Sequence, residues 1–152
     1  MIERIISGGQ TGADRGALDA AIAAGVPHGG SCPRGRRAED GPIPDRYNLV
    51  ETASREYAAR TAANVCAADA TLLVTRGRPR GGSALTAEIA RQRGAPLCHI
   101  DLDREPDPAA ALVSFLRSRA PRTLNVAGPR ESNCPGISRD TRALLLDALA
   151  AL

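Results

Sequence analysis

The segment Ile5-Ile-Ser-Gly-Gly-Gln-Thr-Gly-Ala-Asp-Arg-Gly16 decides the fold class of this chain. A short β-branched run over residues 3–7 predicts a buried strand, and the glycine-rich turn after it leads directly into an alanine-rich amphipathic segment over residues 13–24. This order of strand, turn and helix is typical of an anion-binding βα unit, because the turn amides and the amino end of the helix attract negative charge.

The spacing of the glycines in this turn excludes two common nucleotide motifs. It matches neither the P-loop, which needs Gly-Lys-Ser/Thr, nor the dinucleotide pattern G-x-G-x-x-G. Thr11 and Asp14 have the spacing of a capping box, and Gly25 is expected to end the helix. We expect an anion to bind at Gly8, Gly9, Gln10, Thr11 and Gly12; alternatively, the glycines serve only the tight turn.

The rest of the chain alternates between strand-like and helix-like segments. Strands are predicted at residues 70–75, 97–102 and 123–127, with a short one at 48–51, and helices at 54–67, 83–93, 107–118 and 138–152. This alternation predicts an α/β fold with a mainly parallel sheet and helices on both faces. A length of 152 residues is that of a single domain, 1–152.

Two further glycine turns follow predicted strands. The first is Gly81-Gly82-Ser83 with Thr86, and the second is Gly128-Pro129-Arg130 with Ser132. Ligands of parallel sheets bind beyond the carboxyl ends of the strands, so all three turns are expected to face one pocket. Arg130 is a candidate phosphate clamp, because a guanidinium can hold a phosphate through two hydrogen bonds.

The segment over residues 27–49, called the flap here, has a different composition. It holds six glycines and prolines between Gly29 and Pro42, together with Arg36 and Arg37. Long loops in compact domains are usually functional or mobile, so we expect a mobile flap whose two arginines help to bind the ligand. A solvated, charged loop is the alternative.

The predicted helix over residues 54–67 has a polar stripe at helical spacing. Its members are Tyr57, Arg60, Thr61 and Asn64, and the opposite side carries mostly small apolar residues. Such a stripe is more often the solvent-facing side of a helix than the wall of a ligand cavity, and the sequence leaves both interpretations open.

Composition excludes several classes of protein. Net charge is only +3 and aromatic residues make up 2% of the chain, so the stacking surfaces of single-strand nucleic-acid binders are missing. The four cysteines lack zinc-ligand spacing and are typical of a reduced, cytoplasmic protein, and no metal site is predicted. No apolar run reaches the ~18 residues that a membrane helix needs.

Several long motifs together resemble one known family. They are the segment Ser7–Asp19, the segment Cys32–Pro44 with Cys-Pro-Arg-Gly-Arg-Arg-Ala-Glu-Asp-Gly-Pro-Ile-Pro, Arg60-Thr61-x-x-Asn64-Val65, Gly81-Gly82-Ser83-Ala-Leu-Thr86 and Leu124-Asn-Val-Ala-Gly-Pro-Arg130. They cover nearly the whole chain in order, and they resemble the molybdenum-cofactor carrier family, also described as the circularly permuted YpsA group of the SLOG superfamily. Ser31 and Ser83 depart from that family's pattern, in which Trp and Thr are usual.

This resemblance implies a Rossmann-like three-layer sandwich and a homo-oligomer, either dimer or tetramer. It also implies a non-catalytic carrier that binds a phosphorylated pterin or nucleotide-type ligand, with the molybdenum cofactor as cargo and molybdenum enzymes as recipients. A more distant similarity to lysine-decarboxylase-like phosphoribohydrolases, carried by Gly81-Gly82 and Glu88, implies the alternative. That alternative is a nucleotide-processing hydrolase with Glu88 or Asp14 as its acid/base.

Overall fold

The computed structural model describes residues 1–152 as nine strands, five α-helices and one 3-10 helix. The strands are β1 (Arg4–Ile6), β2 (His28–Gly29), β3 (Ser31–Cys32), β4 (Arg37–Ala38), β5 (Gly41–Pro42), β6 (Val50–Glu51), β7 (Ala70–Thr75), β8 (Leu97–Asp101) and β9 (Thr123–Ala127). The helices are α1 (Ala13–Ala24), α2 (Tyr57–Ala67), α3 (Gly81–Arg93), α4 (Pro108–Arg119), α5 (Ile137–Ala151) and the 3-10 helix η1 (Glu131–Asn133).

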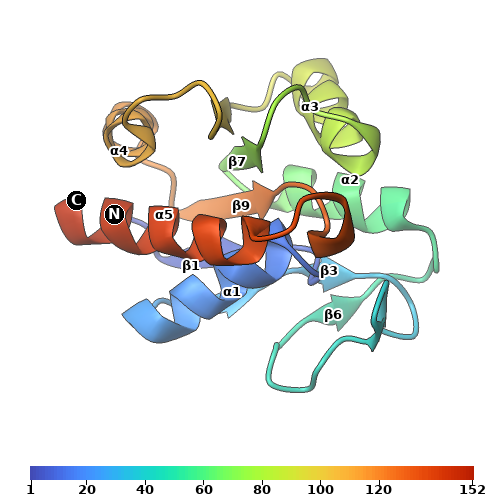
Figure 1. Ribbon diagram of the computed structural model, residues 1–152. Coiled ribbons are helices and arrows are strands. Elements are labelled where there is room, and N and C mark those ends of the chain that lie inside the picture. The colour runs from blue at the N-terminus through green and yellow to red at the C-terminus, as the bar shows by residue number, and fades with distance from the viewer.

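The central sheet has five strands in the order β2-β1-β9-β7-β8, and every pairing in it is parallel. Figure 1 shows α1 and α5 side by side in front of this sheet. Helices α2 and α3 pack against each other and cover the opposite face. The predicted fold class, a Rossmann-like three-layer α/β sandwich, is therefore confirmed, and the sheet is parallel throughout.

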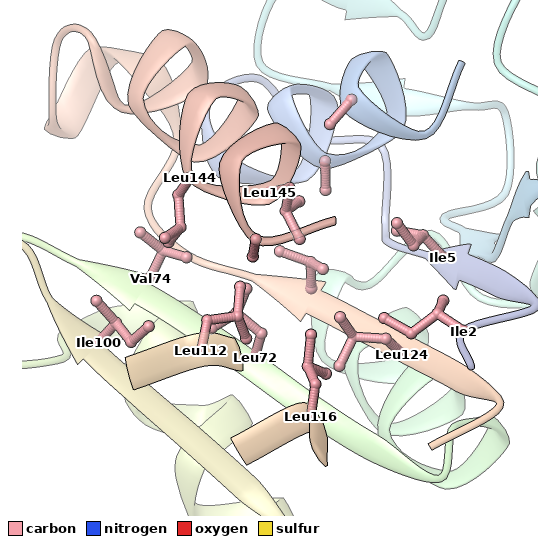
Figure 2. Close-up of a cluster of buried hydrophobic side chains, with 14 of the residues drawn as sticks. Ile2, Ile5, Leu72, Val74, Ile100, Leu112, Leu116, Leu124, Leu144 and Leu145 are labelled. Atoms are coloured by element: carbon pink, nitrogen blue, oxygen red, sulfur yellow. The ribbon is translucent and has the colours of Figure 1, made fainter. Parts of the chain in front are cut away.

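The main hydrophobic core lies between the sheet and the layer of α1, α4 and α5. Figure 2 shows Leu72 and Val74 of β7 packed beneath Leu144 of α5 and close to Leu112 of α4. Nearly all of this core is aliphatic, as the scarcity of aromatic residues requires. Burial on this scale dominates the favourable free energy of folding, at roughly 25 cal/mol per Å² of apolar surface.

The opposite face of the sheet is unusually polar. Residues of a strand alternate between faces, so Thr71 and Thr75 of β7 point away from the main core, as does Asn125 of β9. All three are buried. These side chains form the polar floor beneath α2 and α3.

Most predicted segment bounds agree with the structure. Helix α1 and strand β7 have the predicted limits, Gly25 ends α1 in the left-handed conformation, and the Asp107 carboxylate caps α4 by accepting a hydrogen bond from the Ala110 amide. The predicted capping box of α1 is wrong. Gly12 is the N-cap, with φ at +83°, and no side chain caps the helix.

The flap contains more regular structure than expected. Strand β3 pairs with β6 in parallel, and β4 pairs with β5 in an antiparallel hairpin. Ile43, Tyr47 and Leu49 are buried and form a second apolar cluster with Leu18 of α1. The predicted mobility of the flap stays a prediction.

Candidate functional site

One cavity of about 620 Å³ opens at the carboxyl edge of the central sheet. The turns after β1, β7 and β9 all contribute to its wall, as expected for a sheet whose strands run parallel. Only three of its 23 lining residues are hydrophobic, so it differs from the apolar pockets typical of drug-like ligands.

The structure brings nine of the fifteen predicted binding residues to this cavity. They are Gly8, Gln10, Gly81, Gly82, Ser83, Thr86, Gly128, Pro129 and Arg130. Asp14, one of the two residues named for the alternative enzyme, also lines it. All three glycine turns are therefore represented at one site.

Gly9 and Gly12 do not line the cavity, because they pack against neighbouring chain segments. A side chain on Gly9 would meet the side chains of Ile43 and Leu49 in the flap. A side chain on Gly12 would meet the Pro129 carbonyl and the backbone that follows it. These two glycines allow close packing of the opening turn, and they do not face the cavity.

Arg36 and Arg37 also lie away from the cavity. The Arg36 guanidinium donates to the backbone carbonyls of Ile43, Pro44 and Tyr47, so it organises the interior of the flap. Arg37 stacks on the ring of Tyr57, with its guanidinium carbon 4.4 Å from the centroid. Neither residue supplies charge to the cavity wall.

Thr11 and Ser132 are engaged by a carboxylate of the flap. The Glu39 carboxylate accepts hydrogen bonds from the Thr11 hydroxyl and from both the amide and the hydroxyl of Ser132. These contacts hold the β4–β5 hairpin against η1. Burial acts to raise the pKa of Glu39, but the hydrogen bonds from Ser132 and Thr11 outweigh it and lower that pKa.

Glu88 is outside the site. Its carboxylate is exposed on α3 and accepts hydrogen bonds from Arg91 and Gln92 on the same helix. The hydrogen bond from Arg91 lowers the pKa of Glu88 most strongly. The structure therefore contradicts the expectation that Glu88 could act as an acid/base at the cavity.

Three of the four residues in the polar stripe of α2 line the cavity, and Tyr57 does not. Arg60, Thr61 and Asn64 all lie on its wall, whereas Cys66 on the other side of the helix is exposed. The Asn64 side chain accepts a hydrogen bond from the Ser31 amide and donates one to the Ser31 carbonyl. The less common of the two interpretations of this stripe is the correct one.

Three arginines after β7 also line the cavity, although they were not predicted from the sequence as site residues. They are Arg76, Arg78 and Arg80. Arg76 forms ion pairs with Asp103 and Asp140, whereas Arg78 and Arg80 form none. These arginines stand at every second position directly after a buried strand, and this pattern in the sequence could have identified them.

The electrostatics of the wall favour an anion. Five arginines line the cavity, and Asp14 is its only acidic residue. Arg60 lies 3.4 Å from the Asp14 carboxylate and donates to the Gly8 carbonyl, while Arg130 comes no closer than 3.9 Å to Glu39. Arg76 is paired with Asp103 and Asp140, but Arg78 and Arg80 have no acidic partner, so the site has excess positive charge.

Asp14 lies at the base of the opening turn and is buried. Burial raises its pKa, and the opposing effect of the nearby Arg60 guanidinium does not fully compensate. Its carboxylate also accepts a hydrogen bond from the Gln10 amide. The excess positive charge of the wall therefore increases when this group takes up a proton.

Two buried polar atoms on the cavity wall have no hydrogen-bond partner. They are Nε2 of Gln10, in a residue that is 4% exposed, and Oγ of Ser83, in a residue that is 5% exposed. Buried donors are nearly always paired in folded proteins, because an unpaired one costs about 1–3 kcal/mol. Gln10 and Ser83 therefore each have one polar group left to pair.

No group of three or more histidine, cysteine, aspartate or glutamate side chains lies close enough together to hold a metal ion. None of the helices is both long enough and apolar enough to span a lipid bilayer.

Fold and site together define a Rossmann-like α/β protein with a cationic cavity at the carboxyl edge of its sheet. The chain belongs to the circularly permutated YpsA SLOG family, whose sequence profile matches residues 5–149. A solved structure from Syntrophus aciditrophicus SB, named as a candidate molybdenum carrier protein, is 47% identical with a TM-score of 0.94. The similarity covers 97% of this chain and 95% of the other. No curated protein matches the sequence.

Proposed function

We propose that this protein is a non-catalytic carrier that holds a phosphorylated pterin or nucleotide-type ligand in the cavity, with the molybdenum cofactor as its cargo. The observation that carries the proposal is a wall of five arginines that also includes Gln10 and Ser83, each with one unpaired polar atom. The 47% identity to a protein named for molybdenum carriage supports the choice of cargo.

The proposed ligand contacts come from the three glycine turns and from α2. Arg60 and Arg130 supply positive charge, the backbone near Gly8 and Gly128 allows close approach, and Ser83 offers a free hydroxyl. Neutral polar residues, among them Asn64, Thr86 and Asn125, also line the cavity. Binding of this kind needs no bond to be made or broken, so it fits reversible carriage.

A hydroxyl that donates its proton to a histidine can act as an activated nucleophile. The Thr75 hydroxyl on the cavity wall lies beside His99 but does not have this arrangement. The Thr75 hydroxyl lies 2.7 Å from the Gly77 carbonyl oxygen and 2.7 Å from Nε2 of His99. Because a carbonyl can only accept, the Thr75 proton points to Gly77 and the ring nitrogen donates to the hydroxyl. This arrangement supports a carrier, because His99 acts as a donor to Thr75 and not as its base.

Calorimetric titration with anaerobically prepared molybdenum cofactor tests this proposal. We expect one ligand per chain, and we expect Gln10→Glu to weaken binding by about tenfold or more, because it replaces the free Nε2 donor with a negatively charged oxygen. This variant keeps the oxygen that accepts hydrogen bonds from Thr11 and Glu39. Glu88→Gln, outside the cavity, is the matched control. Absence of binding by the wild-type protein would overturn the proposal.

The buried Asp14 favours one alternative, a hydrolase that acts on nucleoside monophosphates. Its raised pKa suits a general acid, and it lies on the cavity wall. Incubation with nucleoside monophosphates would release free base, and Asp14→Asn would abolish that release. No base released from any nucleotide would exclude this alternative.

We also propose, on the strength of family membership, that the protein acts in the cytoplasm as a homo-oligomer and passes its cargo to molybdenum enzymes. Mixing the loaded protein with a cofactor-free molybdenum enzyme tests the last step. The enzyme should gain activity faster than it does with an equal amount of free cofactor.

A further inference from the structure

We propose that the cavity contains two separate anion subsites, one at each end, and that its ligand carries two anionic groups joined by a neutral polar segment. This inference rests on the proposed function and narrows the chemical class of its ligand. It follows from where the charges and the unpaired buried atoms lie.

The first subsite is formed by the turn after β1 together with Arg60 of α2 and Arg130. Gln10 places its unpaired Nε2 on the wall here, while its side-chain oxygen accepts hydrogen bonds from the Thr11 and Glu39 amides. Those two bonds fix the orientation of the amide group. Arg60 and Arg130 provide the charge, and both lie close to the Tyr57 ring, 5.3 Å and 5.2 Å from its centroid.

The second subsite is the amino end of α3. This helix has 13 residues, and no side chain caps its first turn. The amino end of a helix carries positive partial charge and free amides, which favours an anion. The unpaired buried hydroxyl of Ser83 lies in this first turn, and Arg78 and Arg80, which have no acidic partner, line the cavity beside it.

The sheet topology separates the two subsites. Strand β9 lies between β1 and β7, so the turns after β1 and β7 are two strand spacings apart. Each spacing is about 4.8 Å, which puts the two turns roughly 10 Å apart. One phosphate group cannot reach both turns at that distance.

Strand β9 and the turn that follows it lie between these two turns. Gly128 follows β9, and even a methyl group there would meet the Val74 carbonyl and the Ala13 side chain, so the backbone stays close-packed. Asn64, Thr86 and Asn125 provide neutral polar groups on the cavity wall. A ligand with an anion at each end and hydrogen-bonding groups between them matches this arrangement.

A graded series of alkane-1,n-bisphosphonates, each compared with the monophosphonate of equal chain length, tests the inference. We expect one bisphosphonate to bind about 100-fold or more tighter than its monophosphonate, with shorter and longer members weaker. In Gln10→Glu, and separately in Arg80→Gln, this advantage should disappear, since each variant disables one subsite. Arg130→Gln provides a second variant at the first subsite, and Arg93→Gln, exposed at the far end of α3, is the control.

The results of these titrations distinguish a failure of the two-subsite inference from a failure of the proposed function. If monophosphonates bind and no bisphosphonate binds more tightly than they do, the cavity has a single anion subsite and the two-subsite inference is wrong, while the carrier proposal stands. If neither class of compound binds, and the molybdenum cofactor also fails to bind, the proposed function itself is wrong.

Discussion

Gly8 and Gly9 are neighbours in the opening turn and serve different purposes. Gly8 lines the cavity, and its carbonyl accepts a hydrogen bond from Arg60. Gly9 has φ at +74° and lies under the flap, where Ile43 and Leu49 leave no room for a side chain. Sequence alone gives two identical residues, and only the packing of the flap distinguishes them.

We therefore expect Gly9→Ala to destabilise the fold by about 2 kcal/mol. A methyl group would lie 2.5 Å from Cδ1 of Leu49 and would force a positive φ on a residue with a side chain. Urea unfolding measures the change. Gly82→Ala is the control, because Gly82 has open space around it and should lose no stability. Equal stability of the two variants would mean that the flap does not cover Gly9.

The buried carboxylate of Asp14 predicts a pH dependence of anion binding. Burial raises its pKa against the influence of Arg60 and Arg15, so it becomes protonated at a higher pH than an ordinary aspartate. Loss of that negative charge strengthens anion binding as the pH falls through the raised pKa. Sulfate is a suitable probe because it stays fully ionised across this range.

Asp14→Asn should bind sulfate on the order of tenfold more tightly at neutral pH and should lose this pH dependence. Glu88→Gln is the matched control, because it removes an exposed carboxylate that lies outside the cavity. Identical pH profiles for wild-type protein and Asp14→Asn would show that this carboxylate does not act on the bound anion.

At the scale of the elements, α2 shows what a periodic pattern can and cannot reveal. The pattern correctly predicted a helix, which begins at Tyr57, three residues later than expected. It could not reveal which face is inside, because an inward polar face requires a polar floor. That floor comes from Thr71, Thr75 and Asn125 on other elements.

Features that depend on one segment were predicted well, and features that depend on partners from other segments were not. Central strands such as β7 are buried on both faces, so their apolar runs predict them well. The three glycine turns were expected to meet because they follow parallel strands, and residues of all three do line one cavity. The roles of Thr11, Arg36 and Ser132 depend on partners in the flap or beyond it, and no local pattern contains that information.

The Glu39 contacts predict that the flap contributes to stability in a pH-dependent way. Glu39→Gln should lower the free energy of unfolding by about 1–2 kcal/mol at neutral pH, because charged hydrogen bonds to Ser132 and Thr11 are lost. The pKa of Glu39 is lowered in the folded state, so its stabilisation is present at neutral pH and is lost as the pH falls through that value.

Urea unfolding at several pH values measures this effect. The difference between wild-type protein and Glu39→Gln should shrink toward zero in acid. Glu56→Gln serves as the control, since Glu56 is exposed and its carboxylate forms no ion pair or hydrogen bond. A difference that stays constant with pH would contradict the assignment of these hydrogen bonds.

At the scale of the whole molecule, one face of the central sheet contributes mainly to stability and the other face contributes mainly to the candidate binding site. The face covered by α1, α4 and α5 holds the main apolar core, whereas the face covered by α2 and α3 holds the polar cavity. The charged and neutral polar side chains of the cavity wall do not belong to the main core, so substituting them makes binding defects separable from folding defects.

Family membership leads us to expect a homo-oligomer in solution. Sedimentation velocity should give a mass of two or four times the 15.8 kDa of one chain, over a range of micromolar concentrations. A monomer at every concentration would contradict this expectation without bearing on the cavity.

The central claim is that the cationic cavity carries the molybdenum cofactor. The most direct measurement is mass spectrometry of the small molecules released by gentle denaturation of protein purified anaerobically from a molybdenum-supplied cell, with Gln10→Glu purified in parallel. We predict a phosphorylated pterin in the wild-type sample at up to one per chain and much less in the variant. Absence of any pterin from the wild-type protein, combined with its failure to bind added cofactor, would contradict the claim.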